Sequence, residues 1–114
     1  LDYGCASGLF VKYLQEKGFA RSYGYDPYAS KDGFGNNDIF QQAPFDYILL
    51  QDVIEHVEDP RELLSQLDAL LAPGGYILIG TPNAANIDLS KPGISDFYNS
   101  VHVHIIFIFT PLKF

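Results

Sequence analysis

The first residues with a chemically informative spacing form a turn of small residues that is accompanied by acids. Gly4, Ala6 and Gly8 alternate with other residue types just after Asp2, and Asp26 follows about 20 residues further along the chain. Small residues at this spacing let the backbone turn sharply and approach a ligand closely. Asp26 closes a predicted strand, where a carboxylate can accept hydrogen bonds from both hydroxyls of a ribose. The pattern therefore predicts a site for a ligand that carries a nucleoside.

Two other interpretations of this turn remain open. A dinucleotide fingerprint, G-x-G-x-x-G, requires a third glycine at position 9, which is Leu9. Dinucleotides also need a pyrophosphate cradled at a helix N-terminus, whereas the acid Asp2 suits a positively charged group. Alternatively, the glycines make only a tight strand-to-helix turn, and Asp26 only begins a turn with Pro27. The glycine turn and Asp26 occur in register within one βαβ unit, which favours a binding site over two unrelated turns.

A second polar group follows a buried strand predicted at residues 45–50. Gln51 and Asp52 come directly after this strand, and Glu55 and His56 lie one turn further on. His56 could accept a proton from a substrate hydroxyl, or it could be a structural histidine near a helix start. Asp52, Glu55 and His56 lie close enough for a divalent metal site, but such clusters more often serve capping and ion pairing, so we expect no metal. Cys5 is disfavoured as a nucleophile because no second catalytic group is placed beside it.

Residues 45–60, FDYILLQDVIEHVEDP, resemble the fourth-strand motif of class I S-adenosylmethionine-dependent methyltransferases, in the branch that includes ubiquinone-biosynthesis-type O-methyltransferases. Residues 70–79, LLAPGGYILI, resemble the L-x-P-G-G motif that precedes strand five of that family. The glycine turn and Asp26 stand in the family's order, so the resemblance extends to about Asn83.

The resemblance implies an enzyme that binds S-adenosylmethionine, which carries an ammonium and no phosphate, and transfers its methyl group to a small-molecule acceptor, with oxygen the favoured atom. Asp26 would hold the ribose and Pro27 would lie beside the adenine. His56 would lie near the substrate mouth as the candidate catalytic residue. The remaining cofactor-binding candidates line the methionine end or face the methyl group: Asp2, Gly4, Cys5, Ala6, Gly8, Gln51 and Asp52.

Three features depart from the family pattern. Ala6 replaces the middle glycine, a change that the turn tolerates if φ stays negative there. The segment between Asp26 and Phe45 is too short for the usual helix, full third strand and acidic adenine contact, and Asp38 is the one candidate for that contact. The chain also ends where the last helix and two strands of the sheet should follow. These departures support an alternative function as a non-catalytic, degenerate methyltransferase-fold module that acts in partner binding.

Alternating strands and helices predict an α/β, Rossmann-like, doubly wound and mostly parallel sheet in a three-layer sandwich that lacks its last strands. One partial cofactor-binding domain is expected over residues 1–114. The first helix should present Leu9, Phe10, Tyr13 and Leu14 on one apolar face. The expected strands are 1–3, 22–25, a short one near 38–40, 45–50, 76–79 and a β-prone segment at 101–109. The expected helices are 9–17, stopped at Gly18, and one from Asp59-Pro60-Arg61-Glu62 through a leucine stripe to 71, which Pro73-Gly74-Gly75 ends.

The net charge of −7 and the scattered lysines and arginines argue against a nucleic-acid partner. No run of apolar residues approaches the length of a membrane span. The single cysteine excludes an internal disulfide and fits a cytoplasmic protein. The chain contains no Met and opens within a predicted strand, so we expect preceding sequence.

The apolar run Ile105–Phe109 would be an aggregation hazard if it were exposed, so we expect missing elements or a homo-oligomeric partner to cover it. His102 and His104 would share one strand face, where a substrate loop is favoured over a metal. Thr110-Pro111 could open a further helix.

Overall fold

The structure of the chain is a computed structural model that describes residues 1–83, 90 and 104–109, with the backbone alone in the last range. Its strands are β1 (Asp2–Tyr3), β2 (Gly24–Tyr25), β3 (Phe45–Gln51), β4 (Leu71–Pro82) and β5 (His104–Phe109). Its helices are α1 (Leu9–Glu16) and α2 (Pro60–Asp68), with short 3-10 helices η1 (Ser30–Asp32), η2 (Asn37–Gln42) and η3 (Ile54–His56).

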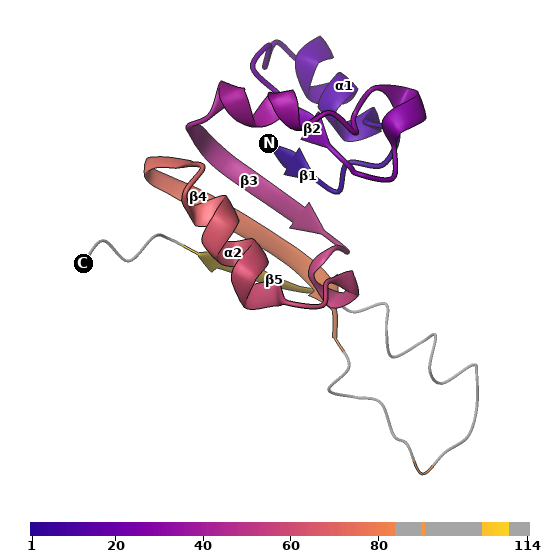
Figure 1. Cartoon of the computed structure of the whole chain (residues 1–114), viewed down its shortest axis with the longest axis vertical. Helices are drawn as coiled ribbons and strands as arrows, with labels where there is room; N and C mark the ends of the chain where they lie inside the picture. The colour runs from indigo at the N-terminus through magenta and orange to yellow at the C-terminus, as the bar shows by residue number, and fades with distance from the viewer. Residues whose placement is uncertain (84–89, 91–103, 110–114) are drawn as a thin grey trace.

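The strands form one sheet in the order β2-β1-β3-β4-β5. The first four strands are parallel, and β5 runs antiparallel to β4. Figure 1 shows that β1, β3 and β4 point toward the same edge of the molecule. The predicted mostly parallel sheet is therefore confirmed.

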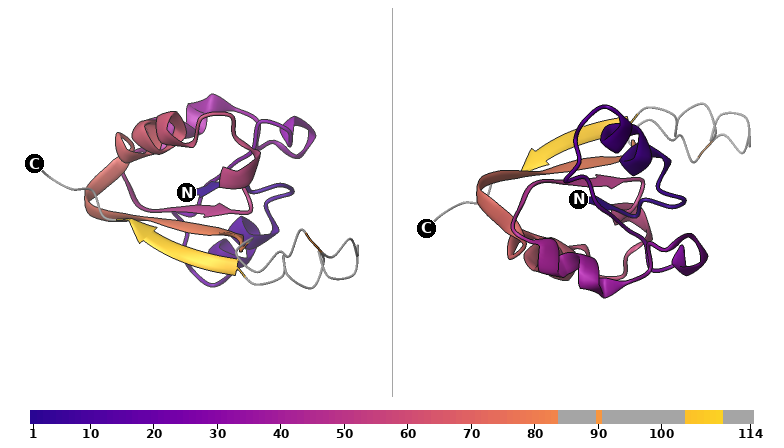
Figure 2. Two further views of the ribbon diagram at one scale, coloured as in Figure 1. Left: turned by 90° about the horizontal axis from the view of Figure 1, so that it is seen from below. Right: turned by 90° about the horizontal axis from the view of Figure 1, so that it is seen from above.

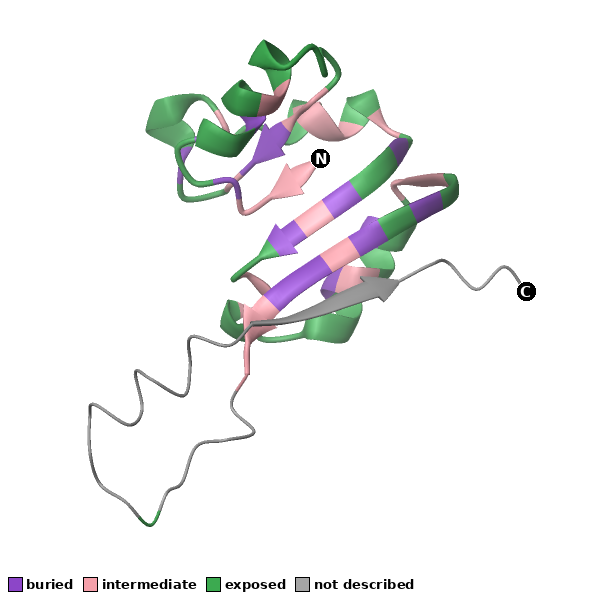
Figure 3. Cartoon of the chain, turned by 180° about the vertical axis from the view of Figure 1, so that it is seen from behind, coloured by how far each residue is buried: buried purple, intermediate pink, exposed green. Residues whose placement is uncertain are grey.

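Helices cover the two faces of this sheet unequally. Figure 2 shows α1 on one face and α2 with η2 on the other, which gives the predicted three layers. The core lies on the α2 face, where Ile48 and Leu50 of β3 are 0 % exposed. They pack with Ile77 and Ile79 of β4 and with Leu67 of α2. Figure 3 shows the same contrast, because β3 and β4 carry buried positions while α1 is largely exposed.

The start of α2 follows the predicted capping pattern. Asp59 Oδ1 accepts hydrogen bonds from the backbone N–H groups of Arg61 and Glu62, at 3.0 Å each. Pro60 occupies the first turn, where its missing N–H costs no helical hydrogen bond. The Glu62 side chain accepts from Gln66 Nε2 at 2.9 Å, so it supports the helix surface rather than the cap.

The apolar side chains predicted to share one face of α1 are mostly exposed. Val11 is the one buried residue of this helix, whereas Leu9 is 72 %, Phe10 47 % and Tyr13 53 % exposed. Val11 packs closely over Gly24 of β2, where an added Cβ would lie 3.0 Å from its Cγ2. The helix therefore contacts the sheet mainly through Val11, and its larger apolar side chains are left exposed.

The strand predicted near residues 38–40 is also wrong, because these residues lie in η2. The Asn36 side-chain oxygen accepts from the Asp38 N–H at 2.9 Å and caps the first turn of η2. Phe40 then packs on Tyr25, with ring centroids 4.7 Å apart. A local cap and an aromatic contact therefore outweigh the β propensity of Ile39 and Phe40.

The segment Pro73-Gly74-Gly75 lies within β4 and does not end α2 as predicted. The helix closes earlier, where Leu70 N–H donates to Leu67 O and Phe45 N–H donates to Leu70 O, which returns the chain to the sheet. Phe45 pairs with Leu71, but Tyr47 pairs with Tyr76, so the intervening residues form an irregularity in the strand.

Several predictions concern residues outside the described ranges. These are His102, the helix start at Thr110-Pro111, the first part of the segment 101–109 and most of the loop after Pro82. Residues 104–109 form the edge strand β5, and their coverage by a partner remains a prediction. Within the described part of the chain, no helix has the length and apolarity that a membrane crossing requires.

The packing of α2 on the sheet predicts a large loss of stability for Leu67→Ala. Leu67 is 1 % exposed, and its truncation should lower the free energy of unfolding by about 2–5 kcal/mol. Urea denaturation measures this loss. The control Leu9→Ala removes a side chain that is 72 % exposed and should change the unfolding free energy by less than about 0.5 kcal/mol. Equal losses in both variants would contradict the placement of the core.

Candidate functional site

The predicted site residues follow the ends of three neighbouring parallel strands. The glycine turn follows β1, Asp26 follows β2, and Gln51 is the last residue of β3. Asp2 pairs with Gly24 on one side and with Leu49 on the other, so these three strand ends lie in register. Ligands of open parallel sheets bind beyond the carboxyl ends of the strands, so the structure brings these residues to the expected edge.

The backbone of the glycine turn is held by the end of β2. The N–H groups of Gly4 and Cys5 donate to the carbonyl of Tyr25 at 2.7 and 3.2 Å. The next N–H, of Ala6, donates to the carboxylate of Asp26 at 2.9 Å. These N–H groups are therefore engaged within the chain. A pyrophosphate would need them as donors, so the turn suits a cofactor without phosphate better than a dinucleotide.

Gly4 and Gly8 adopt left-handed conformations, with φ of 85° and 72°. Both glycines are also required by packing. A Cβ at Gly4 would overlap the Cγ2 methyl of Val53, and a Cβ at Gly8 would overlap the ring of Phe34. Sequence reasoning missed Val53 and Phe34, because no local pattern links them to a turn that lies far away in the chain.

The condition of a negative φ at Ala6 is not met, because φ there is 48°. A left-handed conformation costs a residue with a Cβ about 1–2 kcal/mol. The hydrogen bond from Ala6 N–H to Asp26 Oδ2 holds this conformation in place. The turn therefore keeps the shape that a glycine would adopt easily, and strain of this kind often accompanies a binding site.

Asp26 accepts two backbone hydrogen bonds, one on each oxygen. Oδ2 accepts from Ala6 N–H and Oδ1 accepts from Tyr28 N–H, both at 2.9 Å. A carboxylate has about four lone-pair sites, so capacity remains for two ribose hydroxyls. Pro27 is exposed beside it, and Tyr28 is 97 % exposed. Tyr28, which the sequence analysis did not select, therefore offers an aromatic surface to a base held next to Asp26.

Asp2 lies in β1 and is half-buried. Its burial raises the pKa of this carboxyl above 3.8, and the nearby charge of Asp26 raises it further. A carboxylate that is poorly solvated attracts a cation more strongly than an exposed one does. Asp2 therefore suits an ammonium, as the sequence predicts for the methionine end of the cofactor.

Cys5 is buried, and its thiol is poorly suited to nucleophilic attack. Burial, with the charges of Asp2 and Asp26, raises the pKa of this thiol to about 11. At neutral pH the reactive thiolate is therefore a very small fraction. Its Sγ lies 2.7 Å from the position that a Cβ on Gly24 would occupy, so the side chain packs inward. Cys5 contributes its backbone to the turn, and its place in the cofactor site stays a prediction.

Gln51 and Asp52 are fixed at the end of β3 by contacts with β4. Asp52 has a φ of 54°, and its N–H donates to the carbonyl of Gly80 at 2.8 Å. Gln51 Nε2 donates to Asp52 Oδ2 at 3.1 Å. The Gln51 amide also lies over Gly80, where a Cβ would collide with it. Both side chains are exposed at this edge, where the sequence places them for the cofactor.

His56 is exposed at the end of η3, and its backbone N–H donates to Val53 O at 3.0 Å. Asp38 lies in η2, where its carboxylate accepts from Asn36 Nδ2 at 3.0 Å. Among the side chains that the structure describes, no three of His, Cys, Asp or Glu are grouped so that they could hold a metal ion. The close approach of Asp52, Glu55 and His56 that a metal site needs is therefore not found in the described residues.

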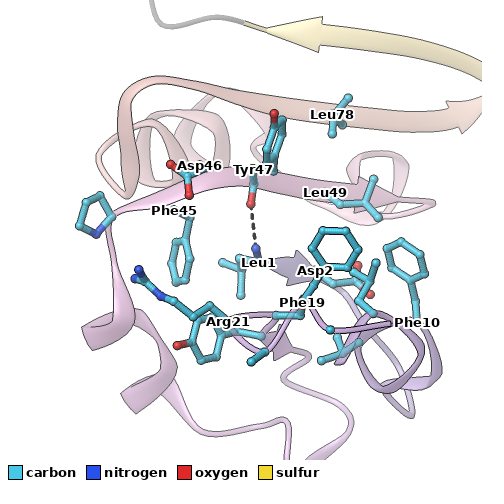
Figure 4. A pocket seen from close by; sticks show the side chains of 17 residues that line it. Leu1, Asp2, Phe10, Phe19, Arg21, Phe45, Asp46, Tyr47, Leu49 and Leu78 are labelled. Carbon is cyan, nitrogen blue, oxygen red and sulfur yellow. Dashed lines mark hydrogen bonds between the residues drawn. The ribbon is translucent and has the colours of Figure 1, made fainter. Parts of the chain in front are cut away.

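A large cavity lies elsewhere, on the α1 face of the sheet (Figure 4). It has a volume of about 780 Å³ and is mostly apolar. Phe10 and Phe19 line it from α1 and the turn that follows, and Tyr47, Leu49 and Leu78 line it from the sheet. Asp2 is the one predicted site residue that it reaches, so this cavity is not the predicted cofactor site.

The fold is that of a Rossmann-like domain. Its candidate residues lie at the edge of the sheet where domains of this class bind nucleoside-containing ligands. A family model described as a methyltransferase domain matches residues 1–105 of the chain. The chain therefore belongs to the methyltransferase-domain family, the S-adenosylmethionine-dependent methyltransferases that its motifs resemble.

Curated relatives agree with this assignment. A ubiquinone biosynthesis O-methyltransferase from Caulobacter sp. (strain K31) is 30 % identical over 105 residues, which cover 73 % of this chain and 40 % of that protein. A protein of the same name from Bradyrhizobium sp. (strain ORS 278) is 33 % identical over 100 residues, covering 73 % and 39 %. The mitochondrial one from Dictyostelium discoideum is 27 % identical over 111 residues, covering 73 % and 35 %. The chain thus spans about two fifths of the length of the first two relatives.

The strained turn predicts that Ala6→Gly stabilises the fold. Glycine removes the left-handed penalty but gains freedom in the unfolded chain, so the net rise in unfolding free energy should be about 0.5–1 kcal/mol. Chemical denaturation measures it. Ala69→Gly is the matched control, because Ala69 has a φ of −64° and its replacement should destabilise. A loss of stability in Ala6→Gly would show that the turn does not adopt this conformation.

Because Asp2 is half-buried, Asp2→Asn should raise the free energy of unfolding by an amount that depends on pH. The folded state raises the pKa of this carboxyl, so its charge destabilises the native state above the folded pKa. Asp2→Asn should therefore raise the unfolding free energy at pH 7. The gain should fade as the pH falls through the folded pKa and vanish below 3.8, where Asp2 is neutral in both states. Chemical denaturation at pH 7 and below pH 3.8 measures the change. The control Asp32→Asn, at an exposed position of η1, should not raise the free energy of unfolding in this way.

Proposed function

We propose that this chain forms the cofactor-binding core of an enzyme that transfers a methyl group from S-adenosylmethionine to an oxygen of a small-molecule acceptor. The single observation that carries the proposal is the position of Asp26. Its carboxylate follows β2 and joins the glycine turn through Ala6 N–H, so one group both shapes the turn and faces the ligand edge.

When bound, the cofactor would supply a methyl group on a sulfonium: an acceptor nucleophile would attack the methyl carbon in line, the carbon–sulfur bond would break, and the neutral thioether would leave. The chain's own residues then serve mainly to bind and orient. Asp26 accepts hydrogen bonds from the ribose hydroxyls, and Asp2 attracts the ammonium of the methionine end. Gln51 and Asp52 border the reacting end from β3. The N–H groups of Gly4, Cys5 and Ala6 are engaged within the chain, so these three offer no donors to a phosphate, which supports this cofactor over a dinucleotide.

His56 is proposed to take the proton that the acceptor hydroxyl loses. An imidazole can accept a proton near neutral pH, and an exposed position after β3 is open to a substrate. Oxygen as the acceptor atom is supported by the relatives, which are named O-methyltransferases. Those relatives are longer than this chain, so the activity of the whole protein remains part of the proposal.

A second candidate function is a non-catalytic module that binds a partner. The observation that favours it is the short connection from β2 to β3, which contains η1 and η2 but no strand. β2 is therefore an edge strand of the sheet, and an adenine contact from a further strand is absent from the described residues. A module of this kind would not bind the cofactor.

Calorimetric titration with S-adenosylhomocysteine, the demethylated product, tests the proposed function. The 114-residue chain should bind it saturably. Asp26→Asn retains one acceptor oxygen but loses the charge, and it should weaken binding by about 10- to 100-fold, the range for a hydrogen bond to a charged group. Asp32→Asn changes an exposed acid in η1 and should bind like the unmodified chain.

Folding must be verified in each variant by its cooperative unfolding transition. A folded chain that ignores S-adenosylhomocysteine would support the non-catalytic module and reject the enzyme. Equal weakening by Asp26→Asn and Asp32→Asn would show that general charge, rather than the position of Asp26, governs binding.

A further inference from the structure

A hydrogen bond between two side chains connects η3, which follows β3, with the end of β4. Thr81 Oγ1 donates to Glu55 Oε2 at 3.1 Å. Thr81 is half-buried near the end of β4, and Glu55 lies in the middle of η3. Neither residue belongs to the cofactor-binding set described above. The bond therefore ties η3, which carries His56, to the end of the neighbouring strand.

The same segment touches the glycine turn at its other end. Val53 precedes η3, and its Cγ2 methyl fills the space where Gly4 would carry a side chain. Because Gly4 begins the turn that is proposed to hold the cofactor, a shift of η3 would move Val53 against that turn. Residues 52–56 therefore span the distance from the end of β4 to the cofactor turn.

The backbone of residues 52–56 begins with an unfavourable conformation that neighbouring contacts must hold. Asp52 has a φ of 54°, which a residue with a side chain adopts at a cost. Its N–H is held by Gly80 O at 2.8 Å, directly beside Thr81. The backbone bond at Gly80 and the side-chain bond at Thr81 therefore hold Asp52 and Glu55, respectively, on consecutive residues of β4.

We propose that Glu55 and Thr81 form a positioning pair, which holds η3 on the end of β4 and so fixes the Asp52–His56 segment relative to the cofactor turn. This inference rests on the proposed function for its effect on the cofactor. The pair does not touch the cofactor itself. It acts through the backbone of η3 and through the contact of Val53 with Gly4.

Three variants isolate the hydrogen bond. Thr81→Val keeps the shape of the side chain but removes the donor, and Glu55→Ala removes the acceptor. Glu55→Gln retains an amide oxygen that accepts from Thr81, so it should preserve the bond. Gln66→Ala is the matched control, because it deletes another exposed hydrogen bond between side chains, to Glu62 at 2.9 Å on α2.

Amide hydrogen exchange of the unliganded chain measures the anchoring directly. Thr81→Val and Glu55→Ala should each speed exchange at residues 53–57 by about 3- to 10-fold, the factor expected for one lost hydrogen bond. The double variant should exceed neither single variant, because both remove the same bond. Glu55→Gln and Gln66→Ala should leave exchange in this segment unchanged. Effects of the two single variants on exchange that add in the double variant, or no effect in either, would contradict the proposed pair.

Titration with S-adenosylhomocysteine then measures the coupling to the turn. Thr81→Val and Glu55→Ala should raise the dissociation constant by about threefold or more, while Glu55→Gln restores the affinity. Faster exchange with unchanged affinity would overturn the positioning role. If the unmodified chain binds no S-adenosylhomocysteine, the proposed function fails, whereas the exchange measurement still decides whether the pair holds the segment.

Discussion

The hydrogen bond from Ala6 N–H to the Asp26 carboxylate is the contact on which the ligand edge depends. It joins the turn after β1 to the end of β2 across a separation of 20 residues, and it holds Ala6 in a left-handed conformation. The carbonyl of Tyr25 secures the two preceding N–H groups in the same way. The turn is thereby shaped before any ligand arrives, and the N–H groups of Gly4, Cys5 and Ala6 are used within the chain rather than offered to a phosphate.

Strain marks the two neighbouring strand ends of this edge. Ala6 after β1 and Asp52 after β3 are the residues other than glycine with a positive φ among those described. Each is held by a hydrogen bond of its own N–H, to Asp26 and to Gly80. Such conformations persist only where the surroundings over-determine them, and they gather at ligand sites. The backbone thus singles out the edge that the sequence motifs indicate, and the large cavity beside Phe10 lies apart from it.

The sequence predicted the parallel sheet, the two helices and the location of the candidate residues at the strand ends, because motif order and strand ends are local signals. It missed what distant contacts decide. The φ of Ala6 follows from its bond to Asp26, and Phe34 and Val53 enter the site only through space that Gly8 and Gly4 leave open. Residues 38–40 are helical because a side-chain cap outweighs their local propensity. Pro73 lies in β4 because pairing within the sheet outweighs the local signal for a turn.

The most direct test of the central claim is the map of ligand contacts by ¹H–¹⁵N NMR during titration of the chain with S-adenosylhomocysteine. The structure predicts that the largest shifts occur at residues 4–8, at 26–28 and at Gln51 and Asp52. A map confined to Phe10, Phe19 and Tyr47 would place the ligand in the cavity on the α1 face instead. That result would contradict the assignment of the strand ends as the cofactor site.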